Sequence, residues 1–594
     1  MGYSSLYDCI KDLEKTNQLI RIKETVDPEL EMAAIHLEAF KNKGPAVFYE
    51  NIKGYNYPAV SNLFGTIERT NYIFRDQIDE IKQILSFKYE PEQIFKSFFK
   101  KLPLILKTKN AFPKKVKLSN QAFREIKLND IPAIKCWKED GGAFLTLPEV
   151  FSMDPEFNDI MKSNLGMYRI QLNGNKYNED EIGLHYQIHR GIGIHHKKAL
   201  KLNKPLKVSI FLGGPPAHIV AAVMPLPENI SELMFAGLLN NNKFNYDVVD
   251  GYCINAAADF VITGELALND LKPEGPFGDH LGYYSLKHLF PYLKVHKVYA
   301  KNNPVLPFTV VGRPPQEDSQ FGAFIHSLTG SFIQNEIQGV EEVNAVDEAG
   351  VHPLLLAIGK ERYVPYNENQ KPQELLTIAN RILGYGQLSL AKYLFITSKN
   401  GTYISTKNIQ QFFAYILQRI DFKRDIHFIT KTTIDTLDYT GEGLNEGSKV
   451  VFAANGEKKR QLGNNPPFGK LIMDGVVAVK LKPFQNYNEA KETIDQLKSK
   501  ILSANNYKAY PLVIACDDEN FVADNINNFL WVTFTRSNPS HDIYGINENI
   551  SFKHWSCEDV LIIDARKKPH HAPELILDEN IQTKAKNILE KYIK

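Results

Sequence analysis

Three polar side chains in the middle of the chain form a possible set of metal ligands. Asn164 lies in the segment NLGMYR, His185 and His189 both lie in LHYQIHRG, so that either could be the histidine of the set, and Glu232 stands at the start of SELMFAG. An amide oxygen, an imidazole and a carboxylate form a hard-ligand set that suits Mn²⁺ or Mg²⁺. If the first part of LHYQIHRG is extended, His185 and His189 share one face of a strand, because side chains alternate along a strand.

A second group of side chains in the same region could bind an acid and move a proton. Arg169 closes the segment NLGMYR, while Glu274 and Asp279 lie five residues apart across the Gly-Pro-Phe-Gly turn of PEGPFGDH. A guanidinium group pairs with carboxylates through two hydrogen bonds, and a positioned carboxyl group can act as a general acid or base. For Asp279 to donate a proton, we expect a partly apolar pocket that raises its pKa.

Each of these residues also has an ordinary structural interpretation. A single histidine such as His189 is more often a satisfied or surface residue than a ligand, and Arg169 could form a structural ion pair. Glu232 could simply favour the positive end of a helix. The sequence HHKK at 195–198 is predicted to be a solvated basic patch. Whether the candidates converge depends on the fold.

Composition and missing motifs exclude several classes of protein. The chain has 594 residues, 43% of them hydrophobic, and 70 Lys and Arg against 69 Asp and Glu. Ample apolar sequence excludes global disorder, and the near-neutral balance excludes a strongly basic nucleic-acid coat. The five cysteines form no CxxC pair, so no disulfide framework or structural zinc site is expected. Kinase, dinucleotide-binding, zinc-protease and hydrolase motifs are missing, and no segment resembles a signal peptide or a membrane span, so we expect a cytoplasmic protein without an integral membrane segment.

The pattern of helix-like and strand-like segments changes along the chain, which predicts a multidomain protein of α/β and β units. Residues 1–115 mix a helix whose apolar residues share one face with strand-like runs, which predicts an α/β domain. Residues 116–330 contain many strand-like runs, HIVAAVM (218–224) among them, separated by Gly, Pro and Asn clusters, which predicts a barrel-like β domain. Helices and strands alternate again in the remainder of the chain.

The last part of the chain contains an internal repeat. Residues 391–428 and 509–545 each show an apolar strand, a polar turn, a helix, and then an Arg six residues before an Asp. A linker rich in Gly, Pro and Asn separates the two copies at 458–470. We therefore predict two tandem α/β domains, at 331–457 and at 470–594 with a terminal helix.

A series of motifs over residues 1–455 resembles the UbiD decarboxylases, the prenylated-flavin enzymes typified by 3-polyprenyl-4-hydroxybenzoate decarboxylase. The motifs are VDPELE, CWKEDGGAFLT, NLGMYR, IHRG, SELMFAGLL, PEGPFGDHLGYY and VVGRPPQED. The resemblance implies an N-terminal α/β domain, a central split β-barrel like that of flavin reductases, and a C-terminal α/β domain. It also implies prenylated FMN with Mn²⁺ and K⁺ at its phosphate.

The resemblance assigns roles to particular residues. The implied Mn²⁺ ligands are Asn164, His189 and Glu232, with His189 preferred over His185 because HRG is the matching context. The implied catalytic set is Arg169, Glu274 and Asp279. The residues implied to line the cofactor also include Thr146, Ala222, Val223, Met224 and Pro225.

The two C-terminal copies depart from the family pattern to different degrees. In the first copy the acidic turn of the family has become SKNGTY, and only Arg419 and Asp425 of the motif remain. The second copy keeps DDEN and FLWVTFTRSNPSHD, including Arg536 and Asp542. Longer chains of this type resemble the menaquinone-pathway decarboxylases. Which copy covers the site stays open at this point.

These observations predict a prenylated-FMN-dependent carboxy-lyase that decarboxylates an aromatic acid, in menaquinone or ubiquinone biosynthesis. A flavin prenyltransferase would supply the cofactor, and the chain is expected to form a homo-oligomer. The alternatives are a split-barrel flavin reductase or FMN-binding electron-transfer protein, and a non-catalytic assembly or carrier protein. For the substrate, a polyprenyl hydroxybenzoate and a bicyclic naphthoate both remain, with the duplicated C-terminal domain favouring the naphthoate.

Overall fold

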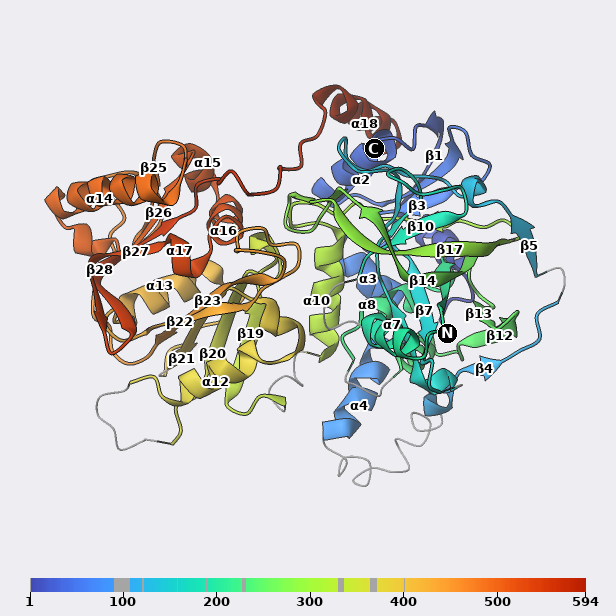
Figure 1. The fold of residues 1–594 in the computed structure, drawn as a ribbon, viewed down its shortest axis with the longest axis horizontal. Coiled ribbons are helices and arrows are strands. Elements are labelled where there is room, and N and C mark those ends of the chain that lie inside the picture. Colours follow the sequence, from blue (N-terminus) through green and yellow to red (C-terminus); the bar gives the residue numbers. More distant parts are fainter. Residues whose placement is uncertain are drawn as a thin grey trace.

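The computed structural model describes residues 2–89, 107–119, 122–157, 159–186, 191–226, 231–329, 336–363, 371–399 and 401–593. Two lobes are visible in Figure 1, with the N-terminal and middle parts of the chain in one and the later strands and helices in the other. Helix α10 (Glu317–Thr329) lies where the lobes meet. The architecture is a mixed α/β multidomain fold, as predicted.

The N-terminal unit is an α/β layer, as the sequence predicts. Helix α1 (Leu6–Lys15) begins after Ser5, whose hydroxyl accepts a hydrogen bond from the Asp8 amide at 3.2 Å, an N-cap that satisfies one of the free amides of the first turn. A four-stranded sheet follows in the order β1-β2-β3-β18, in which β18 comes from residues 306–307 of the next domain. The other elements are β1 (Leu19–Val26), α2 (Glu31–Lys41), β2 (Ala46–Ile52), β3 (Ala59–Ser61), α3 (Ile67–Ile73), α4 (Ile78–Tyr89) and β18 (Leu306–Pro307).

The middle domain is built on a nine-stranded sheet whose neighbouring strands all run antiparallel. Its order is β6-β9-β10-β17-β14-β11-β7-β8, with β5 added against β17. The strands are β5 (Phe123–Ile126), β6 (Phe144–Leu145), β7 (Glu149–Met153), β8 (Ser163–Gly166), β9 (Ile170–Gln171), β10 (Glu181–Leu184), β11 (Leu206–Leu212), β14 (Phe260–Glu274) and β17 (His288–Lys301).

Smaller elements surround that sheet. A hairpin of β15 (Phe277–Gly278) and β16 (Tyr284–Ser285) carries Asp279 in its connection. The remaining elements are β4 (Lys114–Lys115), β12 (Asn245–Val249), β13 (Tyr252–Asn255), α7 (Gly191–Lys201), α8 (Pro216–Val223) and α9 (Glu232–Leu239).

Two local predictions for the middle domain are wrong. The run at 218–224 is not a strand, because it lies in α8 and continues into its C-cap. Pro216 stands in the first turn, where its fixed φ favours a helix, and the run that follows does not alternate between apolar and polar residues. The histidines of HHKK are not solvated either: His195 and His196 are buried on α7, and Ser152 and Tyr186 contact their ring nitrogens at 3.0 and 2.7 Å.

The two C-terminal units have sheets of identical topology. The first has the order β19-β20-β21-β23-β22 and the second β24-β25-β26-β28-β27. In both, the two central pairings are parallel and the two outer pairings antiparallel. Their elements are β19 (Val340–Ala345), β20 (Leu354–Gly359), α12 (Glu374–Leu383), β21 (Tyr393–Ser398), α13 (Ile409–Arg419), β22 (Ile426–Thr433), β23 (Glu446–Ala454), β24 (Lys470–Met473), β25 (Val476–Lys480), α14 (Tyr487–Ser503), β26 (Leu512–Cys516), α15 (Glu519–Asp524), α16 (Ile526–Thr535), α17 (Pro539–Asp542), β27 (Ile543–Ser551) and β28 (His554–Asp564).

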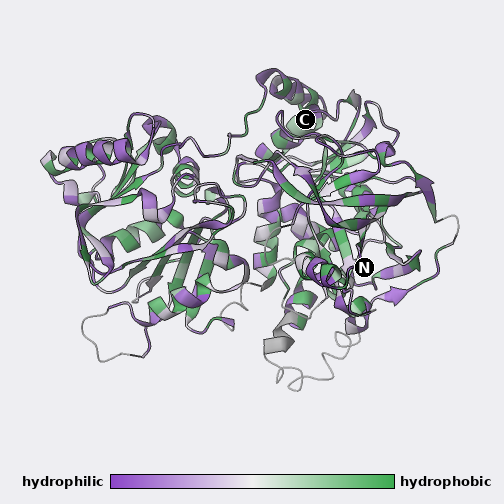
Figure 2. Cartoon of the chain, in the orientation of Figure 1, coloured by the Kyte–Doolittle hydropathy of each residue, from purple (hydrophilic) through white to green (hydrophobic). Residues whose placement is uncertain are grey.

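One apolar core joins these two units. It includes Phe395 and Phe413 of the first unit, and Phe529 and Phe534 of the second. The ring of Phe413 lies 6.0 Å from that of Phe529. In Figure 2 the strands of this lobe are largely green, whereas α14, on its outer side, is largely purple. The units therefore bury their apolar faces against each other, which stabilises the pair through the loss of water-exposed apolar surface.

The chain returns to the first lobe after the second C-terminal unit. Residues 565–578 cross between the lobes, and helix α18 (Glu579–Tyr592) packs beside α2 (Figure 1). Lys584 and Lys591 pair there with Glu31 and Glu24, each at 2.8 Å. No helix in the described ranges has both the length and the apolar character that crossing a membrane requires.

Candidate functional site

Arg169, Glu274 and Asp279 come together in the buried part of the middle domain. The Arg169 Nε and Nη2 atoms donate to the two carboxylate oxygens of Glu274, both at 2.8 Å. Its Nη1 atom donates to Asp279 Oδ2. The side chains are at most 9% exposed, so the pairing occurs where solvent screens it weakly. Glu274 is the last residue of β14, and Asp279 directly follows β15. The chain between these strands therefore brings both carboxylates to the Arg169 guanidinium.

The pKa of Asp279 is lower than its usual value, not higher as the sequence suggested. Burial alone would raise the pKa, but the hydrogen bond from His280 and the charge of Arg169 outweigh burial. His280 donates to Asp279 Oδ1 from its backbone amide at 2.7 Å and contacts the same oxygen through Nδ1 at 2.8 Å. The expectation of an apolar pocket overlooked these partners, which favour the charged carboxylate.

Two of the three predicted metal ligands are neighbours. Glu232 Oε2 accepts from the amide of Leu165 at 3.1 Å, and Leu165 is the residue after Asn164. Burial raises the pKa of Glu232 to about 7, and Asn164 Nδ2 is buried without a hydrogen-bond partner. Glu232 offers a carboxyl oxygen, and Asn164 offers its amide oxygen Oδ1, which accepts from the Tyr168 hydroxyl at 3.3 Å. Oxygen ligands of these two kinds suit a hard divalent ion.

The third predicted ligand, His189, lies outside the described residues. The alternative, His185, is buried just after β10, with its ring 4.3 Å from that of Phe290. Burial and the nearby charge of Arg169 hold its pKa well below the usual value. The chain returns next to Asn164 at Gly191, where an added Cβ would lie 2.2 Å from Asn164 Oδ1.

The predicted cofactor-lining residues lie in two segments of the middle domain. Thr146 is buried, and its hydroxyl donates to the Thr309 carbonyl at 2.7 Å and accepts from the Thr309 amide at 3.0 Å. Ala222 and Val223 end α8, Met224 is its C-cap, and Pro225 follows. The Ala222 carbonyl accepts from the Met167 amide at 2.9 Å, which connects α8 to the segment between Asn164 and Arg169.

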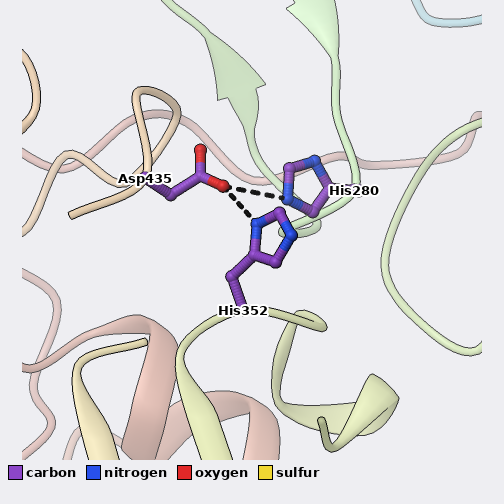
Figure 3. A group of neighbouring side chains, drawn as sticks. All are labelled: His280, His352 and Asp435. Carbon is purple, nitrogen blue, oxygen red and sulfur yellow. Dashed lines mark hydrogen bonds and ion pairs between the residues drawn. The ribbon is translucent and has the colours of Figure 1, made fainter. Parts of the chain in front are cut away.

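Residues that sequence reasoning missed extend the Arg169 cluster into the first C-terminal unit. His280 stands between Asp279 and Asp435, whose Oδ2 atom also accepts from His352 (Figure 3). Tyr439 of the same unit accepts from the Leu286 amide at 2.8 Å and contacts His288 Nε2 at 3.1 Å. The only sequence signal was the position of His280 directly after Asp279, since the others lie in loops without a motif.

The second C-terminal unit holds the loop that follows Asp279. Trp531 Nε1 donates to the Leu281 carbonyl at 2.8 Å, and its ring stacks on Tyr283 with centroids 5.2 Å apart. Arg536 Nε donates to the Tyr283 hydroxyl at 3.0 Å. Both C-terminal units therefore contact residues 279–288, the first through its loops and the second through helix α16 (Ile526–Thr535) and its C-cap.

A cavity of about 490 Å³ lies where the three units meet. Most of the residues lining it are polar: His288, Thr436, Asp438, Tyr439, Thr440, Glu442, Tyr487, Asn538, His541 and His570. It borders the group of Arg169, Glu274 and Asp279, because its lining residue His288 is paired with Glu274 across strands β14 and β17. A second cavity, of about 790 Å³ between the N-terminal and middle domains, contains none of the predicted site residues.

Three family models match the chain in order. The N-terminal domain of 3-octaprenyl-4-hydroxybenzoate carboxy-lyase matches residues 10–88, its Rift-related domain residues 108–314, and its C-terminal domain residues 319–454. A Chlamydia pneumoniae protein, named as a 4-hydroxybenzoate decarboxylase subunit, is 34% identical over 582 residues, covering 97% of this chain and 96% of that protein. The match therefore includes the second C-terminal unit.

Solved structures share the fold. The closed form of vanillic acid decarboxylase from Sedimentibacter hydroxybenzoicus has a TM-score of 0.65 at 24% identity, over 84% of this chain and 99% of that one. An evolved dimeric form of HmfF, a UbiD-class enzyme from Pelotomaculum thermopropionicum in complex with prFMN, has a TM-score of 0.58 at 17% identity, over 78% and 97%.

Proposed function

Because the chain is a carboxy-lyase that belongs to the UbiD family, we propose that it removes CO₂ from an aromatic carboxylic acid with the help of prenylated FMN. The observation that carries the proposal is the buried contact of Arg169 with both Glu274 and Asp279. A guanidinium between two acids can orient a carboxylate and still leave an acid beside it for proton transfer. The names of the relatives, which act on hydroxylated benzoates, support an aromatic substrate.

Asn164, Glu232 and His189 would hold Mn²⁺ at the cofactor phosphate, with K⁺ nearby. The raised pKa of the Glu232 carboxyl, and the position of Asn164 beside the Leu165 amide that contacts Glu232, support this part of the proposal. Thr146 and the segment from Ala222 to Pro225 would line the cofactor in a split β-barrel. When bound, the prenylated flavin would supply the electron sink for the bond that loses CO₂.

The protein side chains would supply position, charge and a proton. Arg169 uses Nε, one Nη1 hydrogen and one Nη2 hydrogen on the two acids, so one N–H on each terminal nitrogen remains to bind the substrate carboxylate. Asp279 would donate the proton that replaces CO₂. Asp279 is charged in this fold, so it would first take that proton from His280 Nδ1, which lies 2.8 Å from Asp279 Oδ1. His280 would carry the proton at neutral pH, because the carboxylates of Asp279 and Asp435 outweigh burial and raise its pKa to about 9.

The cavity of 490 Å³ would admit the substrate. Its volume of about 490 Å³ supports a compact hydroxylated ring over a ring that carries a long polyprenyl tail. We therefore place the substrate among hydroxybenzoates and hydroxylated naphthoates, the precursors expected in ubiquinone or menaquinone synthesis. In the same proposal, a flavin prenyltransferase supplies the cofactor, and the chain forms a homo-oligomer in the cytoplasm. The proposal also has residues 331–457 and 470–594 descend from one duplicated domain, which the identical strand orders of their sheets support.

The test starts from the full chain co-expressed with a flavin prenyltransferase. We expect an absorbance and mass spectrum of prenylated FMN in the purified protein, and CO₂ release from 4-hydroxybenzoate or a hydroxylated naphthoate. Asp279→Asn should abolish turnover, because the carboxamide cannot deliver the proton, and should leave the bound cofactor in place. The control variant is His296→Ala. His296 is an exposed residue of β17 outside the proposed site, so this variant should keep normal turnover.

Two results would contradict the proposal. Normal CO₂ release by Asp279→Asn would remove Asp279 from the mechanism. NAD(P)H-dependent flavin reduction without CO₂ release from any acid tested would support the flavin reductase instead.

A further inference from the structure

His280, His352 and Asp435 converge from three loops of two domains. His280 follows β15 of the middle domain, His352 precedes β20, and Asp435 follows β22 of the first C-terminal unit. One ligand atom from each residue lies within 4.8 Å of the other two. Figure 3 shows both imidazole rings directed at one oxygen of Asp435, Oδ2. We call these three residues the interdomain cluster.

The hydrogen bonds around the interdomain cluster fix the orientation of its members. His280 Nδ1 lies 2.8 Å from Asp279 Oδ1, so a proton on Nδ1 leaves Nε2 directed at Asp435. Asp435 Oδ1 accepts from the Leu437 amide at 2.8 Å, which leaves Oδ2 for the two rings. In many metal sites, one ring nitrogen of a ligand histidine binds the metal and the other donates a hydrogen bond to a carboxylate. Asp279 is that carboxylate for His280.

The inward atom of His280 is poorly satisfied by the protein. His280 Nε2 is buried without a hydrogen-bond partner among the described residues, and its distance to Asp435 Oδ2 is 3.8 Å. Asp435 itself is 1% exposed. A buried ring nitrogen without a partner costs free energy unless a proton partner or a cation satisfies it.

The surroundings of the cluster carry an excess of carboxyl groups. Burial raises the pKa of Asp318 to about 6; the charge of His280 opposes this rise and that of Asp279 adds to it. Burial, Glu348 and Asp318 raise the pKa of Asp347 to about 8. Asp318 interacts electrostatically with His280, as Asp279 and Asp435 do, and negative charge on these groups favours a divalent cation in the cluster.

We propose that His280, His352 and Asp435 bind a divalent transition-metal ion that links the middle domain to the first C-terminal unit. Two imidazoles and one carboxylate suit Zn²⁺ or Fe²⁺, with a position left for water. With metal–ligand distances of about 2.0–2.1 Å in a tetrahedral site, ligand atoms lie roughly 3.3 Å apart. The separation of 3.8 Å between His280 Nε2 and Asp435 Oδ2 needs only a small side-chain rotation to reach that value.

The ion would hold the Asp279 loop from one side without taking part in the reaction. Its ligand His280 directly follows Asp279 in sequence and positions the Asp279 carboxylate through Nδ1. The site is separate from the proposed Mn²⁺ site, because it shares no residue with Asn164, His189 and Glu232. The inference therefore stands or falls independently of the proposed decarboxylation.

Without metal, the same atoms form an ion pair in which a protonated His280 faces Asp279, Asp435 and Asp318. Metal binding must displace the proton from His280 Nε2, since a ligand histidine is neutral. Zn²⁺ affinity should therefore fall at acid pH, where protons compete with the metal for the imidazoles.

The experiment measures Zn²⁺ binding to the full chain prepared without cofactor and stripped with a chelator. We expect one equivalent of Zn²⁺ by elemental analysis and titration calorimetry. Asp435→Asn and His352→Ala should each weaken binding more than tenfold and should abolish the increase in Tm that Zn²⁺ causes. Asp279→Asn, which changes only the residue behind His280, should weaken binding by about 10–100-fold.

Two control variants separate the interdomain cluster from other sites. Glu232→Gln removes the proposed Mn²⁺ ligand and should keep the Zn²⁺ equivalent, and His296→Ala should keep it as well. Zn²⁺ binding that Asp435→Asn and His352→Ala leave unchanged would overturn the proposal. A folded wild-type chain that binds no Zn²⁺ would also overturn the proposal. In that case the interdomain cluster would be only an ion pair of His280 with its carboxylates.

Discussion

The two C-terminal units share one topology, yet they use the same helix in different ways. Helix α13 and the stretch from α16 to Arg536 align over 11 residues without a gap, from Ile409 to Arg419 and from Ile526 to Arg536. At the sixth position the first unit has Ala414 and the second has Trp531. The large ring of Trp531 reaches Leu281 and Tyr283 of the middle domain, which an alanine methyl group cannot do.

The arginines at the ends of the two helices also differ in what they contact. Arg536 finds Tyr283 at 3.0 Å, Glu574 at 3.1 Å and Asp517 at 3.5 Å. Arg419 turns back onto its own helix, where it donates to the Tyr415 carbonyl at 3.1 Å and leaves Nε without a hydrogen-bond partner among the described residues. The first unit reaches the middle domain through its loops instead. Equal topology therefore does not imply equal contacts, because single side chains decide which surface a helix end can reach.

The largest expected effect is that of Trp531→Ala. Removing a buried Trp should lower the free energy of unfolding by about 3–5 kcal/mol, and it should free the loop that follows Asp279. Urea denaturation measures the first effect, and CO₂ release by the folded fraction measures the second. Ala414→Ser, at the matching position of the first unit, should change neither by much; equal losses in both variants would mean that the two helices are used alike.

The paired arginines should give the next largest difference. Arg536→Met should cost about 1.5–3 kcal/mol of stability, because Tyr283 and Glu574 lose a charged hydrogen-bond donor. Arg419→Met should cost less than about 1 kcal/mol, because burial lowers the pKa of Arg419 and only one described acceptor compensates for it. Thermal unfolding of both variants tests the comparison, and a larger loss for Arg419→Met would reverse it.

The acids that follow these arginines should give the smallest effect. Burial raises the pKa of Asp542 to about 6 in the fold, although Lys568 at 3.3 Å opposes the shift. The folded chain therefore binds more protons than the unfolded chain between about pH 4 and 6, so its stability should fall as pH rises through that interval, by less than about 2 kcal/mol. Chemical denaturation at several pH values should show a shallower slope in Asp542→Asn than in the wild type, because other buried carboxyl groups such as Asp318 and Glu232 keep their own contributions.

Asp425 of the first unit provides the comparison for that pH series. Burial raises its pKa as well, but Arg424 contacts it directly. Asp425→Asn should therefore retain the slope that Asp542 causes. A slope that Asp425→Asn removes and Asp542→Asn keeps would assign the pH dependence to the first unit.

Local patterns in the sequence were sufficient for most of the fold. The helical periodicity near the N-terminus predicts α1, whose buried residues include Leu6, Ile10 and Leu13. The strand-rich middle of the chain likewise forms long strands such as β11 and β14. The run at 218–224 resembles a strand in sequence, because a short apolar segment that is buried on all sides shows no clear period. Its proline start and alanine content were the better signal.

The sequence alone determined the residue types of the site and their order along the chain, because the spacing of Arg169, Glu274 and Asp279 is fixed by covalent structure and turn residues. Only the tertiary structure decided the charge state of Asp279, since His280 and Arg169 act on it across space. It alone also brought His352, Asp435, Trp531 and Arg536 to the same loop, from positions 73 to 257 residues beyond Asp279. Electrostatic and packing contacts depend on distance in space, which no local pattern encodes.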